Sequence, residues 1–170
     1  PLSLPMVDLV RAAARHLVGG GDFRTAQIST DADPVGRHIV FPGPEHIAPQ
    51  LARLDDFLDR SANAARSFRA TVAALTIVNC HPLPDGNGRA ARLAFNLIAD
   101  PAHAPRDYYL PLHEIGVFSR GGYIVRLRQA ELHGDWTPIA GFMLAAARFW
   151  RRQVDAAPPF VPPTISMAIA

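Results

Sequence analysis

The stretch HPLPDGNGRAAR, residues 81–92, gathers a histidine, an acid, two glycines, an asparagine and two arginines within twelve positions. The sequence on both sides is strongly apolar. Residues 68–80 are apolar on almost every side of a helix, which predicts a buried central helix. The segment RLAFNLIAD, 92–100, resumes the same apolar character. We therefore expect a short polar loop between two core helices, with the end of the loop forming the N-terminus of the second helix.

The rest of the chain predicts further helices and one β element. Five other helices are expected, at about 3–18, 44–61, 112–119, 121–133 and 137–154. Two short β-type runs, 27–29 and 38–41, flank a turn-rich tip and predict a hairpin. The predicted fold is mainly α, a helical bundle with a small β-hairpin flap at about 24–42. We expect a single domain over 1–154, followed by a proline-rich extension at 155–170.

Composition limits the classes of function. The 170 residues are 49% apolar and 19% charged, with a net charge of +2, so neither a nucleic-acid nor a membrane partner is expected. Cys80 is the only cysteine, which excludes an internal disulfide and a cysteine-rich zinc site. All 17 basic residues are arginine, so chemistry that needs a lysine is excluded as well.

The end of the polar loop has the features of a phosphate site. A helix N-terminus presents unpaired N–H groups and a partial positive charge. Gly86 and Gly88 let a phosphate approach the backbone, and Asn87 caps the helix or donates its own amide. Arg89 and Arg92 lie on one face of the helix. Two guanidinium groups beside an anion site suit a polyphosphate better than a single phosphate.

Asp85 and His81 add the remaining groups for transfer of a nucleotide. Asp85 provides a hard oxygen ligand, and Mg²⁺ commonly bridges a carboxylate and phosphates. His81 can act as a general base near neutral pH. Because the loop holds no suitable nucleophile, we expect an external hydroxyl to attack a metal-bound nucleotide phosphate directly.

Other interpretations of the cluster fit less well. A calcium loop would need oxygen ligands where Arg89 and Asn96 stand. A plain turn accounts for PDGNG but leaves His81 and the two arginines unexplained. A metal site at Cys80 and His81 lacks partners at zinc spacing.

This stretch resembles the signature HPFx(D/E)GNGRxxR of the Fic family, with Leu83 in place of phenylalanine as the one departure. That position is expected to anchor the loop in the core. The similarity extends from about Phe23 to Trp150. It implies a helical domain with a flap hairpin that transfers a nucleotide monophosphate, usually AMP from ATP, to a Ser, Thr or Tyr hydroxyl of a protein.

The resemblance also implies a role for each residue of the motif. His81 would be the general base and Asp85 the Mg²⁺ ligand. The segment Gly86, Asn87 and Gly88 would hold the α-phosphate, Arg89 would contact the β-phosphate, and Arg92 would reach the γ-phosphate. Target-positioning residues in the flap would be Ile28, Ser29, Ile39, Val40 and Phe41. Tyr123 is the candidate for the base pocket.

Comparison with branches of the family favours transfer of a mononucleotide and bears on how the activity would be controlled. The kinase branch carries Lys for the second glycine of GNG, and phosphocholine-transferring relatives lose the first glycine and the distal arginine; neither change occurs here. The inhibitory motif (S/T)xxxE(G/N) is absent around Glu45, Glu114 and Glu131. We therefore expect either a separate, antitoxin-like inhibitory protein or an unrestrained effector.

The expected setting is a bacterial toxin or effector that acts in the bacterial cytoplasm or the cytosol of a host cell. Three alternatives stay open. One is UMP or GMP transfer by the same mechanism, and another is a catalytically slow, nucleotide-binding regulatory module. Removal of the modification is a third, although it generally depends on the missing inhibitory glutamate.

Overall fold

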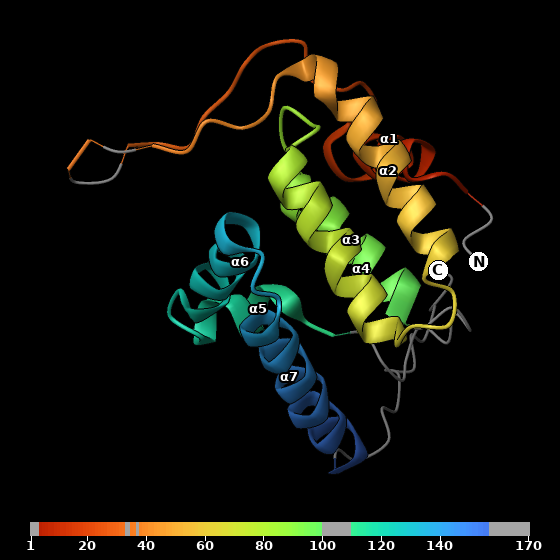
Figure 1. Ribbon diagram of the computed structural model, residues 1–170, viewed down its shortest axis with the longest axis vertical. Helices are drawn as coiled ribbons and strands as arrows, with labels where there is room; N and C mark the ends of the chain where they lie inside the picture. The colour runs from red at the N-terminus through yellow and green to blue at the C-terminus, as the bar shows by residue number, and fades with distance from the viewer. Residues whose placement is uncertain (1–3, 33–34, 37, 100–109, 157–170) are drawn as a thin grey trace, which may run out of the picture.

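The computed structural model describes residues 4–32, 35–36, 38–99 and 110–156. Within these ranges the chain is mainly helical, which confirms the mainly α prediction (Figure 1). The helices are α1 (Met6–Val18), the 3₁₀ turn η1 (Pro44–His46), α2 (Ile47–Arg60), α3 (Arg66–Cys80), α4 (Asn87–Ala99), α5 (Leu112–Phe118), α6 (Gly122–His133) and α7 (Thr137–Ala156).

The centre of the fold is the pair of helices on either side of the polar loop. α3 and α4 lie side by side and antiparallel, with the loop at one end of the pair (Figure 1). The buried side chains of both helices are mainly small, which allows the helix axes to approach closely. They are Ala70, Thr71, Ala73, Ala74, Leu75, Ile77 and Cys80 on α3, and Asn87, Ala90, Ala91, Ala94, Phe95 and Ile98 on α4.

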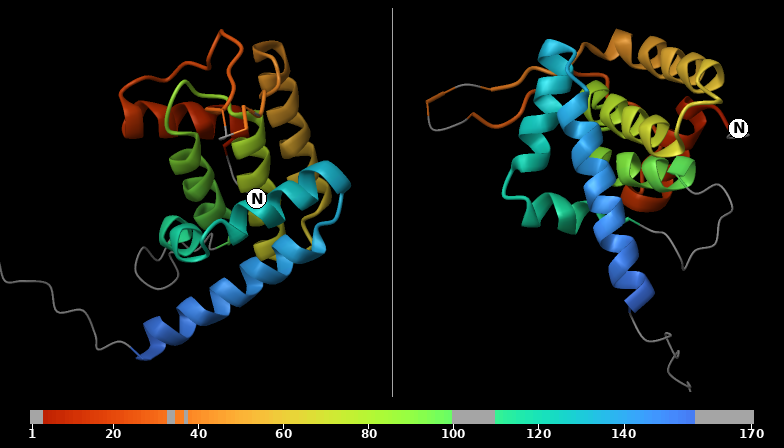
Figure 2. Two further views of the ribbon diagram at one scale, coloured as in Figure 1. Left: turned by 90° about the vertical axis from the view of Figure 1, so that its left-hand side faces the viewer. Right: turned by 60° about the horizontal axis from the view of Figure 1, so that its bottom comes forward.

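The other helices cover this pair. α1 contacts α2 and α4, and α2 also packs against α3. On the other side α7 crosses α3, and α6 packs on α7 (Figures 1 and 2). The fully buried side chains come from all of these layers and include Met6, Ile47, Leu51, Leu75, Ile77, Leu83, Leu127 and Ile139. The polar loop is therefore held between helices that bury most of their apolar surface.

Two local features fix α1. It ends at Gly19, whose φ of 76° is a left-handed conformation that glycine adopts without strain, as the predicted glycine stop requires. At its other end the N–H of Met6 donates to both carboxylate oxygens of Asp55 on α2, at 3.0 and 3.2 Å. Burial raises the pKa of Asp55, while this N–H lowers it. Asp55 thus caps α1 from the neighbouring helix.

The flap at 24–42 projects from the helices as two extended arms (Figures 1 and 2). In its described part the structure has no regular strand, and one isolated antiparallel bridge joins Ser29 and Val40. The Thr30 N–H donates to the Ile39 carbonyl at 2.9 Å. The predicted hairpin is thus reduced to one bridged pair, because two short strands with no sheet beneath them are only marginally stable in water. Positions 33, 34 and 37 of its tip lie outside the described residues.

The end of α7 lies near the start of the expected C-terminal extension. α7 continues to Ala156, so it includes the first two residues of the expected extension. The remainder of that extension, 157–170, lies outside the described residues. Among the helices described, none is both long enough and apolar enough to cross a membrane.

Candidate active site

The polar loop begins where α3 ends. His81 follows Cys80 with φ 47° and ψ 56°, a left-handed conformation, and its N–H bonds to the Ile77 carbonyl at 3.0 Å. Such a conformation costs a non-glycine residue about 1–2 kcal/mol. It turns the chain sharply out of the helix and leaves the imidazole at the rim of the bundle, half-buried.

Asn87 holds the loop in shape. Its Oδ1 accepts the Leu83 N–H and its Nδ2 donates to the Leu83 carbonyl, both at 2.8 Å. Leu83 is fully buried, so the expected anchor in the core is present. Because both ends of the Asn87 amide are engaged and the residue is only 3% exposed, what Asn87 can offer a phosphate is its backbone N–H.

The N-terminus of α4 is the place where the sequence predicts an anion site. Ala90 is the first residue whose N–H bonds back to a main-chain carbonyl, that of Gly86, at 2.9 Å. The N–H groups of Asn87, Gly88 and Arg89 precede it and carry the positive end of the helix dipole. A Cβ at Gly88 would lie 3.2 Å from Nη1 of Arg92. The missing side chain therefore lets the Arg92 guanidinium lie close to these amides.

Asp85 and Arg89, the predicted metal and β-phosphate residues, pair with each other. Nη2 of Arg89 lies 2.8 Å from Oδ2 of Asp85, and Nη1 donates to the carbonyl of Leu17 at 2.8 Å. The Asp85 and Arg89 side chains are 79% and 42% exposed, so both are open to an incoming ligand. The described residues include no cluster of three metal-ligating side chains. A single carboxylate still fits Mg²⁺, which usually binds through one or two carboxylates, phosphate oxygens and water.

The surroundings of His81 determine which ring nitrogen carries a proton and whether the ring is charged. Its Nδ1 lies 3.2 Å from the Val78 carbonyl. A carbonyl can only accept, so Nδ1 carries the proton and Nε2 keeps a free lone pair. Burial lowers the pKa of His81 below its ordinary value of 6.5; the Val78 carbonyl opposes this shift, and the nearby Arg24 charge lowers the pKa further. The imidazole is therefore neutral at pH 7, as a general base must be.

Two residues beside the base have roles that the sequence did not predict. Phe41, expected to face a target, is 7% exposed and stacks on the His81 ring with 4.0 Å between centroids and an interplanar angle of 27°. Arg24, which the sequence left as either a contact to an acidic target or a solvated side chain, is 5% exposed and bonds to the His81 carbonyl. Neither lies in the motif, and no periodicity in the flap marks them as buried.

The other residues predicted from the sequence lie on the flap and on α6. On the flap, Ile28 is half-buried, while Ser29, Ile39 and Val40 are exposed. Tyr123, on α6, packs against Phe142 with 6.0 Å between ring centroids. Burial raises the pKa of Tyr123, and the positive charge of Arg92 opposes this shift.

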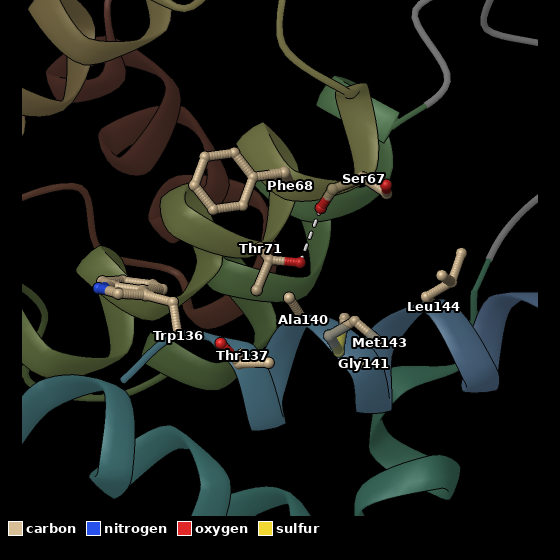
Figure 3. A pocket seen from close by; sticks show the side chains of 9 residues that line it. All are labelled: Ser67, Phe68, Thr71, Trp136, Thr137, Ala140, Gly141, Met143 and Leu144. Carbon is tan, nitrogen blue, oxygen red and sulfur yellow. Dashed lines mark hydrogen bonds between the residues drawn. The ribbon is translucent and has the colours of Figure 1, made fainter. Parts of the chain in front are cut away.

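A separate cavity of about 500 Å³ lies between α3 and α7. Figure 3 shows Phe68 and Thr71 of α3 facing Trp136 and residues of α7, with the Thr71 hydroxyl donating to the Ser67 carbonyl at 2.7 Å. Its lining includes no motif residue and no titratable group. The residues of the motif therefore lie outside this cavity.

Comparison with known proteins agrees with this geometry. The sequence pattern of the Fic/DOC family matches residues 3–99, which include α1, the flap and the whole loop. The chain belongs to the Fic/DOC family. Over 119 residues it is 32% identical to protein adenylyltransferase fic-1 of Caenorhabditis briggsae, covering 63% of this chain and 23% of the relative. The corresponding protein of Culex quinquefasciatus is 33% identical over 108 residues, covering 59% and 20%. This Fic chain thus spans less than a quarter of the length of either relative.

Solved Fic structures share the fold. A Fic family protein from Desulfovibrio desulfuricans superimposes with a TM-score of 0.74 at 25% identity, covering 88% of this chain and 46% of that one. BepC of Bartonella tribocorum, an effector protein solved with bound AMPPNP, gives a TM-score of 0.57 at 16% identity, with 82% and 73% covered. The helical arrangement around the loop is therefore that of the Fic family.

Proposed function

We propose that this Fic domain transfers AMP from ATP to a Ser, Thr or Tyr hydroxyl of a target protein. The observation that carries the proposal is a neutral histidine with a free Nε2 at the start of a loop that ends in unpaired amides and Arg92. Curated relatives are named protein adenylyltransferase, and the BepC structure holds an ATP analogue. Both support ATP as the donor.

The residues of the loop account for each part of the transfer. His81 Nε2 takes the proton of the target hydroxyl as its oxygen forms a bond to the α-phosphorus. The bond from that phosphorus to the oxygen bridging to the β-phosphate breaks, and pyrophosphate leaves. The backbone N–H groups of Asn87 and Gly88 would stabilise charge on the α-phosphate, and the N–H of Gly86, which donates to Oδ1 of Asp85 at 2.6 Å, would join them once Asp85 binds the metal. Arg89 and Arg92 would bind the β- and γ-phosphates and orient the leaving group.

Asp85 would hold Mg²⁺ together with phosphate oxygens. The ion would supply neutralisation of phosphate charge during the displacement. Because Asp85 and Arg89 are paired, binding of the nucleotide would exchange their mutual contact for contacts to metal and phosphate. The pair is exposed, so this exchange costs little, about 1 kcal/mol or less.

The flap and α6 would select the two substrates. An extended target segment could pair along the arms near Ser29 and Val40, whose side chains are exposed beside Ile39. Ile28, half-buried, would pack against the same segment. Tyr123 would line the pocket for the adenine. Phe41 is assigned to the base rather than to the target, since it is buried against His81.

We further propose a toxin or effector role, acting in the bacterial cytoplasm or the cytosol of a host cell and restrained by a separate antitoxin-like protein. Support comes from the sequence, which lacks the inhibitory motif at Glu45, Glu114 and Glu131. Co-purification of the domain with an endogenous inhibitory protein would test this role.

The deciding experiment is incubation of the domain with Mg²⁺, a cell lysate and each of four α-labelled ribonucleotides. We expect labelled protein from ATP, lost in His81→Ala and retained in His113→Ala, an exposed histidine on α5 that serves as the matched control. If protein is labelled only with UTP or only with GTP, that nucleotide is the donor and the proposal of ATP is wrong. Nucleotide binding without label from any donor would refute transfer and favour the regulatory module.

A further inference from the structure

Arg24 connects the flap to the end of α3. Its Nε donates to the His81 carbonyl at 2.7 Å and its Nη2 to the Cys80 carbonyl at 3.3 Å. On the flap side Nη2 also donates to the Pro42 carbonyl, and Nη1 donates to the Ala26 carbonyl at 2.8 Å. A buried charge is costly unless its hydrogen bonds are made. Here neutral carbonyl groups of two separate segments satisfy the guanidinium.

The two carbonyls on the loop side belong to the peptide groups on either side of the His81 Cα. Peptide groups are planar, so the conformation of His81 is set by the rotation of these two planes relative to each other. Holding both carbonyls from one planar guanidinium therefore fixes φ and ψ of His81 at their left-handed values. The main-chain N–H of Arg24 adds a bond to the Pro82 carbonyl at 2.9 Å, which extends the restraint into the loop.

The same guanidinium fixes the residue that supports the imidazole. Phe41, stacked on the His81 ring, directly precedes Pro42, whose carbonyl Arg24 holds. Phe41 is also held to the opposite arm, because its N–H bonds to the Ile28 carbonyl at 3.1 Å and its carbonyl accepts from Gln27 Nε2. Arg24 thus restrains His81 in two ways: it binds the backbone on both sides of His81, and it holds the segment whose Phe41 ring stacks on the imidazole.

We propose that Arg24 is a positioning residue that holds His81 in its strained, base-competent geometry and links that geometry to the bridged arms of the flap. That this positioning serves catalysis rests on the transfer reaction proposed above. Arginine is required because Nε and both Nη atoms are used in one plane. Lysine keeps the charge but cannot reproduce this set of bonds.

The first test uses the unaltered protein. In an NMR exchange experiment the Arg24 Nε–H should exchange with water at least about 100-fold more slowly than the Nε–H of Arg53, an exposed residue on α2. His81 ring protons should also be shifted by the stacked Phe41 ring. Equal exchange rates at Arg24 and Arg53 would overturn the proposal without any variant.

The second test compares Arg24→Lys and Arg24→Met with the matched control Arg53→Met. In both Arg24 variants we expect the ring shift of His81 to disappear and kcat to fall by roughly 10- to 100-fold, with KM for the nucleotide within about threefold. Arg24 is the charged group whose field reaches His81; α3 presents the Val78 carbonyl and the flap an uncharged ring. Loss of the packing around His81 should raise its pKa in both variants, and the pKa should rise further in Arg24→Met, which also removes the positive charge.

These readouts separate two kinds of failure. A folded Arg24→Lys variant with unchanged His81 shifts and kcat would overturn the positioning role. If neither Arg24 variant folds, the exchange measurement on the unaltered protein still decides. Absence of label transfer by the unaltered protein, with a protected Arg24 Nε–H and a shifted His81 ring, would refute the proposed reaction instead.

Discussion

Replacement of Asn87 by alanine tests whether this side chain acts on the loop or on the nucleotide. Asn87→Ala removes two hydrogen bonds of 2.8 Å and leaves the N–H and the carbonyl of the buried Leu83 without partners. Each unsatisfied buried group costs about 1–3 kcal/mol, so a loss of roughly 3 kcal/mol is expected once some water enters beside the exposed loop. For a chain of this length that lowers Tm by roughly 6–12 °C.

Thermal unfolding followed by circular dichroism at far-ultraviolet wavelengths measures the effect directly. Asn87→Asp retains the acceptor for the Leu83 N–H but sets a second acceptor oxygen against the Leu83 carbonyl, so it should lose at least as much stability as Asn87→Ala. Asn79→Ala is the matched control: Oδ1 of Asn79 is buried without a partner, so its removal should leave Tm unchanged or raise it slightly. An Asn87→Ala variant with an unchanged Tm but weakened nucleotide affinity would refute the structural role and return the side chain to phosphate binding.

Three further results are expected. Because burial lowers the pKa of His81, transfer should rise with pH through a midpoint below 6.5 and be level above about pH 7; a profile of kcat against pH with its midpoint above 6.5 would contradict this. Burial raises the pKa of Cys80 to about 11, so alkylation of the folded protein at about pH 8 should be at least roughly 100-fold slower than in denaturant, as mass spectrometry would show. Asp85→Asn should abolish Mg²⁺-dependent transfer while changing the free energy of unfolding by about 1 kcal/mol or less, because its ion pair with Arg89 is exposed; a larger destabilisation would show that the pair is structural.

The sequence was sufficient for features that depend on neighbouring residues. Helical spacing of apolar residues located the helices, and Gly19 ended α1 as expected. The contiguous motif predicted a polar loop between α3 and α4, and the start of α4 within it. These predictions succeed because periodicity and helix termini are encoded within a few positions of each residue.

Features that depend on distant contacts were not predictable in the same way. The flap was predicted as a hairpin from local β propensity, but pairing is limited to Ser29 and Val40 because no sheet supports the arms. From the sequence, Phe41 is expected to face a target on the flap. Its contact with His81 depends on how the flap packs at the end of α3, which local sequence does not specify. The engagement of the Asn87 side chain with Leu83 depends on how the loop folds back, which residue types alone do not specify.

The bond between Arg24 and His81 joins residues 57 positions apart in the chain. A contact between residues so far apart in the sequence requires closure of a long loop, which lowers the conformational entropy of the intervening chain. In this domain that chain includes α2 and α3, so helix docking must precede organisation of the base. We therefore expect the left-handed geometry of His81 to be among the last features to form during folding and among the first to be lost on partial unfolding. A partly unfolded domain can retain its helices, and even an intact motif sequence, while having no ordered base.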